Sequence, residues 1–214
     1  MISMLQNLTV KEFIDELASN SPAPGGGSAA ALAAALAGSL GSMVFNLTIN
    51  KKAYNEYEEE IKNSVLKALE NTNAVKDEFL NLMEKDAEEF LELMAAFKLP
   101  KDTEEEKLYR QNKIDQGYQK ALEIPYKVAN KAFELYKCIE LAARYGNKNA
   151  VSDAGVAALL IQTAVESAVL NVKINLSSVK DQEYKLEVEK QCKSIVDEGL
   201  NKKNEIISIV NSKL

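Results

Sequence analysis

The sequence predicts an all-α protein, a bundle of about six or seven helices with two buried, alanine-rich helices at its centre. Two observations indicate this fold. Residues 28–50 and the segment after Gly146 are long, poor in charge and rich in small side chains, as expected for helices that are enclosed on all sides. Elsewhere helical periodicity recurs, and no segment has the alternation of a convincing β-strand. We therefore expect a single helical domain over residues 1–214.

The first half of the chain carries clear helix boundaries. Thr9 and Glu12 have the spacing of a capping box, which predicts a short helix there. The breaker SPAPGGG follows, and Ser28 is expected to cap the first alanine-rich helix. Residues 56–97 then have a helical pattern with lysine and glutamate outside, and Pro100 ends this helix.

Capping residues and breakers divide the second half in the same way. Pro125 marks a boundary or a kink, and Gly146 ends the helix that contains KCIELAARY. The second alanine-rich helix ends near residue 175, and a last helix runs from about residue 181 to the C-terminus. Polar residues are expected to cap two of these helices: Asp102 or Thr103 for one, and Ser152 or Asp153 for the other.

The first alanine-rich segment is long enough to be a membrane span. It has 23 residues without a charge, and a span needs roughly 20 apolar residues. Seven of them are alanine, however, and polar side chains interrupt the rest: Ser39, Ser42, Asn46 and Thr48. Its transfer into lipid would be weakly favourable at best. A central bundle helix is the better interpretation, because small residues recur where neighbouring backbones would cross: Ala30, Ala34, Gly38 and Gly41.

Composition excludes several classes of function. The net charge of −6 argues against binding of nucleic acid or anionic lipid through bulk electrostatics. No secretion signal is visible, and the distant Cys138 and Cys192 fit two reduced thiols in a cytoplasmic protein. The chain has no histidine, which excludes Ser-His-Asp hydrolysis, histidine phosphorelay and Glu-x-x-His di-iron chemistry. Acid–base chemistry therefore falls to Asp, Glu, Lys, Tyr or Cys.

The glycine stretch has two open interpretations. Gly25, Gly27 and Ala30 fit a dinucleotide fingerprint, but no strand precedes them, and no Walker-type Lys-Ser/Thr pair follows. Gly25, Gly26, Gly27 and Ser28 can instead present backbone N–H groups at a helix N-terminus to an anionic group or a carbonyl oxygen. The alternative is a plain turn with a helix cap.

Two carboxylates are candidates for chemistry. Asp86 occupies a place in an apolar seam of alternating steps, formed by Phe79, Met83, Phe90, Leu93 and Phe97. A carboxylate in such a seam is costly unless it is paired or lines a cavity, and partial burial raises its pKa. The alternative is that Ala87 faces inward and Asp86 is solvated. Asp153 stands at a predicted helix N-terminus, where an acidic residue is also favourable for structural reasons alone.

Several sequence blocks, in order and at matching spacing, resemble one family. They are APGGGSAA, GSMVFNLTINKKAY, DAEEF, LPKDTEEEKLYR, GNKNAVSDAGVAAL and SAVLNVKIN. The family contains the methenyltetrahydrofolate cyclohydrolases and the cyclodeaminase domain of formiminotransferase-cyclodeaminase. The resemblance covers nearly the whole chain, and the blocks around Lys51–Lys52 and Ser152–Asp153 look closer to the stand-alone cyclohydrolases.

The resemblance implies an all-α homodimer that acts on a tetrahydrofolate carrying a one-carbon unit between N5 and N10. As a cyclohydrolase, it would add water to the methenyl carbon of 5,10-methenyltetrahydrofolate to give 10-formyltetrahydrofolate. As a cyclodeaminase, it would release ammonia from formiminotetrahydrofolate. Neither reaction needs a metal or a redox cofactor, so none is expected. A non-catalytic helical protein that binds folate or a partner protein is the third reading.

The resemblance also implies roles for named residues. Asp86 is the leading acid–base or cation-stabilising residue, and Asp153 is the second. Lys51, Lys52, Lys101 and Arg110 are candidates to bind the glutamate carboxylates of folate, with solvated helix-end charges as the alternative. Asn171 and Asn175 are candidates to bind pterin edges or, alternatively, to satisfy buried backbone groups.

Helix length restricts how these residues can combine. A straight helix from Ser28 to Lys51 is roughly 35 Å long at about 1.5 Å per residue. The glycine loop and the lysine pair therefore cannot serve one small pocket within one subunit unless the helix breaks. A site at a dimer interface would remove this conflict.

Overall fold

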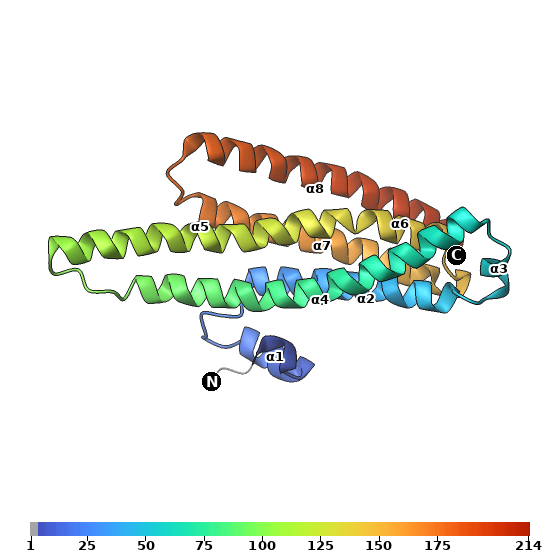
Figure 1. Cartoon of the computed structure of the whole chain (residues 1–214), viewed down its shortest axis with the longest axis horizontal. Helices are drawn as coiled ribbons and strands as arrows, with labels where there is room; N and C mark the ends of the chain where they lie inside the picture. Colours follow the sequence, from blue (N-terminus) through green and yellow to red (C-terminus); the bar gives the residue numbers. More distant parts are fainter. Residues whose placement is uncertain (1–3) are drawn as a thin grey trace.

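The computed structural model describes residues 4–214. Within this part, eight α-helices and two short 3₁₀ helices follow one another (Figure 1). Their bounds are η1 (Leu5–Asn7), α1 (Val10–Leu17), α2 (Gly26–Thr48), α3 (Lys52–Asn55), α4 (Glu59–Ala96), α5 (Glu104–Glu134), α6 (Tyr136–Tyr145), η2 (Lys148–Ala150), α7 (Val151–Leu176) and α8 (Gln182–Asn211). The predicted all-α class is confirmed, and the short α3 is an addition to the expected helices.

The two alanine-rich helices, α2 and α7, pack against each other at the centre. Helix α4 packs on α2, α5 packs on α7, and α4 also packs on α5. Helix α8 lies along α7, and η1 packs on α4. Helix α1 stands outside the bundle (Figure 1). The hairpin of α4 and α5 reaches beyond the other helices at one end, and α3 and the C-terminus lie at the opposite end (Figure 1).

Small residues allow this close packing, as the sequence predicts. Ala30, Ala34, Gly38 and Gly41 are all buried. A β-carbon at Gly41 would lie 2.6 Å from Ile139 Cδ1. A larger side chain there forces the neighbouring helices apart, which costs stability.

By length and composition alone, helix α2 and the segment Lys148–Leu176 are long and apolar enough to cross a membrane. More than half of each is buried inside the bundle. The core helices of a bundle meet the same criterion, because a surface enclosed by other helices and one enclosed by lipid are both apolar.

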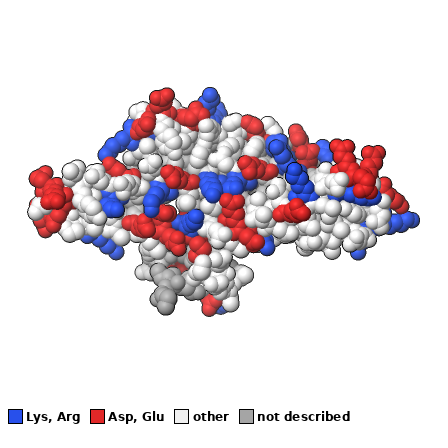
Figure 2. Space-filling view, viewed as in Figure 1, with Lys and Arg blue, Asp and Glu red and all other residues white. Residues whose placement is uncertain are grey.

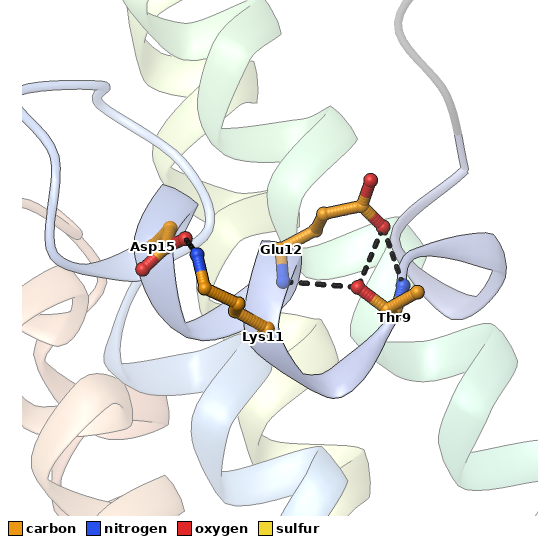
Figure 3. Close-up of polar contacts among 4 residues, drawn as sticks. All are labelled: Thr9, Lys11, Glu12 and Asp15. Atoms are coloured by element: carbon orange, nitrogen blue, oxygen red, sulfur yellow. Dashed lines mark hydrogen bonds and ion pairs between the residues drawn. The ribbon is translucent and has the colours of Figure 1, made fainter.

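The capping box at the start of α1 is confirmed (Figure 3). The backbone N–H of Glu12 donates to Thr9 Oγ1 at 3.2 Å, and the N–H of Thr9 donates to Glu12 Oε2 at 2.7 Å. Lys11 and Asp15, one turn apart, form an exposed ion pair at 2.8 Å. These local contacts explain why a helix of only eight residues forms here.

Other boundaries differ from the prediction. Thr103, rather than Asp102, caps α5 in a second capping box. The helix α2 starts at Gly26 with Gly25 as its N-cap, so the expectation that Ser28 caps it is wrong. Ser28 instead lies in the first turn, where its hydroxyl is free to bond to another helix.

Two further expectations are corrected in the second half. Ser152 and Asp153 do not cap α7, because Ala150 is the N-cap residue and both lie inside the first turn. Pro125 is no boundary, because it lies inside α5, and the break between helices comes at Leu135. Gly146 ends α6 as predicted.

Candidate active site

A cavity of about 190 Å³ lies where the start of α2 meets α4, α5 and α7. Its wall includes Gly25, Gly26, Gly27, Asp86, Phe90, Asn171 and Asn175. Most of the predicted site residues from the first alanine-rich helix, the DAEEF block and the second alanine-rich helix are therefore brought together. An aromatic ring, amide groups and one carboxylate face a common space.

The carboxylate of Asp86 is held against the first turn of α2. Ser28, which is fully buried, donates its hydroxyl to Asp86 Oδ2 at 2.8 Å. Next to it, a β-carbon at Gly27 would lie 2.6 Å from Asp86 Cγ, so only glycine leaves room for the carboxylate. The helix N-terminus also favours a negative charge at this point. Ser28 and Gly27 together fix the position of Asp86.

Burial and hydrogen bonding act in opposite directions on Asp86. Burial raises the pKa of this carboxyl above its usual value, while the Ser28 hydroxyl and backbone N–H lower it in part. The net direction is upward. A carboxylate with a raised pKa is a better proton acceptor near neutral pH than an exposed one, which suits acid–base chemistry.

The apolar seam of α4 combines both interpretations of the sequence. Met83 is buried as expected, and Ala87 also faces inward. Asp86 is nevertheless half-buried rather than solvated, because it turns toward Ser28 on α2. Phe97, the last residue of the proposed seam, is exposed. The seam thus correctly indicates that Asp86 faces the interior, where it lines the cavity. It does not continue to the end of α4, because Phe97 is exposed.

Asn175 satisfies a backbone group that Pro125 leaves unpaired. Proline has no N–H, so the carbonyl of Ala121, four residues earlier, loses its partner within α5. Asn175 Nδ2 donates to this oxygen at 2.8 Å, and also to the carbonyl of Asn171 at 3.0 Å. The alternative that the asparagine satisfies buried backbone is confirmed for Asn175.

Asn171 faces the start of α2. Its Nδ2 donates to the carbonyl of Ser167 at 2.9 Å. A β-carbon at Gly26 would lie 3.1 Å from the same Nδ2 atom. The side-chain amide of Asn171 therefore packs directly on the glycine turn, and Asn171 forms part of the cavity wall.

The other predicted residues are far from this cavity within one chain. Lys51 and Lys52 follow α2 at its other end, about 33 Å away at 1.5 Å per residue. Asp153 is in the first turn of α7, eighteen residues before Asn171, which corresponds to about 27 Å along the helix. Their suggested roles stay predictions that need a second chain.

Two cations lie near the tip of the α4–α5 hairpin. Lys101 is exposed in the connection between these helices. Arg110 donates from Nη2 to the carbonyl of Phe97 at 3.2 Å, and its guanidinium lies over the Phe97 ring. Arg110 thereby satisfies the C-terminal end of α4, and its role toward folate stays a prediction.

Parts of the cavity wall were not predicted from the sequence. Ile174 and Ala121 line it, as does Pro22 from the loop before α2. Ile174 has a signal in the sequence, because it is three residues after Asn171 on α7 and therefore lies on the same side of this helix. Ala121 had none, since its place depends on how α5 packs against α7.

Comparisons with known proteins identify the family of this chain. A sequence model of the formiminotransferase-cyclodeaminase family matches residues 9–194. The chain belongs to this family. The matched range contains the glycine loop, Asp86 and both asparagines of the cavity, so the whole site lies within the family's shared region.

Two relatives illustrate the two branches of the family. A methenyltetrahydrofolate cyclohydrolase from Methylorubrum extorquens is 36% identical over 211 residues, covering 99% of this chain and 100% of the relative. The formimidoyltransferase-cyclodeaminase of Rattus norvegicus is 31% identical over 195 residues, covering 91% of this chain but 35% of the relative. The chain thus spans about a third of the rat protein.

A solved structure has the same fold. The crystal structure of a formiminotetrahydrofolate cyclodeaminase from Thermotoga maritima superimposes with a TM-score of 0.78 at 27% identity. The match covers 98% of this chain and 97% of that one. The helical arrangement that builds the cavity is therefore shared along the full length of both proteins.

Proposed function

We propose that this chain is a methenyltetrahydrofolate cyclohydrolase with Asp86 as its catalytic carboxylate. The observation that carries the proposal is the Asp86 carboxylate itself, half-buried in a cavity and held by Ser28 at the start of α2. The end-to-end similarity to a cyclohydrolase supports the reaction assigned to it.

The chemistry suits a single fixed carboxylate. The substrate carries a positive charge delocalised over N5, the bridging carbon and N10, and a nearby negative charge stabilises it. The oxygen of water bonds to the bridging carbon, and one water proton passes to Asp86. The carbon–N5 bond then breaks as the remaining hydroxyl proton is transferred to N5, which leaves the formyl group on N10. One proton is released to solvent when Asp86 regains its charge.

The cyclodeaminase reaction is the second candidate, because the structural neighbour from Thermotoga maritima bears that name. In that reaction N10 attacks the formimino carbon, and the proton of N10 passes to the formimino nitrogen. A second proton is added to this nitrogen, the carbon–nitrogen bond breaks, and ammonia and the methenyl cation are formed. Asp86 would deliver this second proton rather than remove one. The methenyl cation is the substrate of the cyclohydrolase reaction and the product of the cyclodeaminase reaction. The cavity alone therefore suits either reaction.

Assays on both folates distinguish these reactions. We expect hydrolysis of 5,10-methenyltetrahydrofolate, followed by the loss of its absorbance, and no ammonia release from formiminotetrahydrofolate. Ammonia release without methenyl hydrolysis would contradict the proposal. Asp86→Asn is expected to lower kcat by roughly 10²- to 10⁴-fold, the usual contribution of an acid–base group. Circular dichroism checks that the variant is folded, and an unchanged kcat in a folded variant would show that Asp86 is not the catalytic carboxylate. Absence of turnover of either folate by the wild type would favour a non-catalytic folate-binding protein.

We further propose that the functional unit is a homodimer. One cavity of about 190 Å³ is small for a folate, since pockets for ligands of that size hold about 300–1,000 Å³. Large apolar side chains are exposed along one face of the central pair: Leu36, Met43 and Leu47 on α2, and Val156, Leu159, Leu170 and Ile174 on α7. An exposed apolar surface that includes a few polar positions, here Thr163 and Glu166 on α7, is typical of an interface.

A two-fold axis across this face would complete the site. If the axis is perpendicular to α2, an isologous contact lays α2 of one copy antiparallel to α2 of the other. The start of α2, with its Asp86 cavity, would then face the end of the partner's α2, where Lys51 and Lys52 follow. The partner's Asp153, at the start of its α7, would also lie near this Asp86 cavity. Light scattering after size exclusion is expected to give a dimer, and a monomeric active enzyme would contradict this part.

A further inference from the structure

A second cavity, of about 340 Å³, lies at the opposite end of the bundle from Asp86. It is formed where the end of α2 and the short α3 meet the end of α6 and the start of η2, near the C-terminus (Figure 1). Three tyrosines and four basic residues line it: Tyr54, Tyr57, Tyr145, Lys51, Arg144, Lys148 and Lys213. No acidic residue is among its lining residues.

The walls of this basic cavity are held by specific contacts. The N–H of Asn147 donates to Thr48 Oγ1 at 2.8 Å, and its Nδ2 donates to the carbonyl of Leu47 at 2.9 Å. Beside it, a β-carbon at Gly146 would lie 2.5 Å from Val44 Cγ1, so the two segments approach as closely as glycine permits. The cavity is therefore preformed by two chain segments that are almost 100 residues apart.

The tyrosines form a continuous aromatic wall. Tyr54 packs edge-on against Tyr57 with ring centroids 6.3 Å apart, and Tyr57 packs edge-on against Tyr145 at 5.7 Å. The hydroxyl of Tyr57 donates to the carbonyl of Tyr145 at 3.1 Å. Such edge contacts keep the rings in fixed orientations.

The charge in this cavity is opposite to that of the chain. The protein has a net charge of −6, and acidic and basic side chains alternate over the face seen in Figure 2. In the cavity, by contrast, every charged lining residue is basic. Lys51 and Lys148 form no ion pair within residues 4–214. Their charges are therefore not neutralised by the protein itself.

Lys213 and Arg144, the other two basic residues of the cavity, have partners within the chain. Lys213 Nζ donates to the carbonyls of Ala143 and Arg144, at 2.7 and 2.5 Å. Burial lowers the pKa of Lys213, and the neighbouring charge of Arg144 lowers it further. Glu140 binds Arg144 at 2.7 Å from outside the cavity lining. Glu140 thus offsets the charge of Arg144, and the carbonyls hold the ammonium group of Lys213. Among the described residues that line the cavity, Lys51 and Lys148 are the unpaired cations available to an anion.

We propose that this basic cavity is a binding site for an oxyanion, either a carboxylate or a phosphate group. Lys51 and Lys148 supply charge-assisted hydrogen bonds to its oxygens, and the tyrosines enclose the rest of the ligand. The anion is either a free one or the glutamate carboxylate that ends a folate. Only the second source rests on the proposed function.

Tyrosine fluorescence provides a direct test, because the chain has eight tyrosines and no tryptophan. Inorganic phosphate is titrated into the wild-type protein without any folate, at constant ionic strength. We expect a saturable change in fluorescence. In the Lys51→Gln, Lys148→Gln double variant the affinity is expected to fall by roughly tenfold or more, as for lost charge-assisted bonds. The matched control Lys137→Gln removes an exposed α6 lysine outside the cavity and is expected to bind as wild type.

Competition separates the two sources of the anion. If γ-glutamylglutamate displaces phosphate, the cavity takes carboxylates of a folate tail as well. If it does not, the occupant is a free anion, and the site stands in both cases. Absence of saturable phosphate binding to wild-type protein, or equal affinity in the double variant, overturns the proposal. Because no folate is present, this result is independent of whether the Asp86 cavity hydrolyses methenyltetrahydrofolate.

Discussion

At the scale of single residues, Ser28 tunes the charge of Asp86. Its hydroxyl and N–H lower the pKa of this carboxyl, against the larger upward effect of burial. Ser28→Ala removes the hydroxyl bond, so the pKa of Asp86 rises further. The ionised carboxylate is then present only at higher pH, and the acidic limb of the kcat profile is expected to move upward. A lower kcat with an unmoved limb would contradict this effect of Ser28 on the pKa of Asp86.

Gly27 is a second residue on which the geometry of Asp86 depends. Gly27→Ala places a β-carbon 2.6 Å from Asp86 Cγ, and the flexible carboxylate must move away. Alanine favours the helix, so we expect a melting temperature at or above that of wild type. Activity is expected to fall roughly 100-fold, as for a catalytic group misplaced by about 1 Å.

The control is a glycine on the same kind of helix but far from the cavity. A β-carbon at Gly155 would lie 3.3 Å from Val210 Cγ1, a side-chain tip that can yield. Gly155→Ala is therefore expected to keep its activity. Equal losses in both variants would show that helix crowding, rather than the position of Asp86, limits the rate.

At the scale of helices, α5 and α7 are coupled through one backbone carbonyl. Asn175→Ala leaves the oxygen of Ala121 without the partner that Pro125 cannot provide. We expect a loss of about 1–3 kcal/mol in the free energy of unfolding, the cost of an unpaired buried group. In a Pro125→Ala background, residue 125 can donate to Ala121 within α5, and the same substitution should cost less. Urea denaturation of the four proteins measures this difference, and strictly additive losses would contradict the coupling.

The helices show how far sequence reasoning reaches. Capping boxes at Thr9 and Thr103 depend on contacts within four residues, and both are visible in the sequence. The seam around Asp86 is also local to one helix. The bond from Ser28 to Asp86, in contrast, joins residues 58 positions apart and depends on how α2 crosses α4. A serine at a helix start has a local use as a cap, so nothing in the sequence indicated that it would serve α4 instead.

At the scale of the whole molecule, two features support the proposed homodimer: the exposed apolar side chains of α2 and α7, and the small volume of the Asp86 cavity. The length of the expected helix indicated that Lys51 and Lys52 cannot reach the glycine loop within one chain. In the structure α2 is unbroken, so the two ends are far apart. The sequence also suggested a dimer interface as a way to remove this conflict. It could not indicate which face would form the interface, because that depends on which faces the other helices leave uncovered. Leu170 and Ile174, at 66% and 70% exposure, lie on such a face.

A mixing experiment tests whether the two chains share a site. Asp86→Asn removes the carboxylate from one chain. Lys52→Glu places a negative charge where Lys52 of the other chain is proposed to bind the carboxylates of folate. Each variant alone is expected to have little activity at low folate. After unfolding and refolding an equal mixture, about a quarter of wild-type activity is expected, because half of the dimers are mixed and each has one intact site. If both residues served a site within one chain, no mixed dimer would contain an intact site and activity would not return.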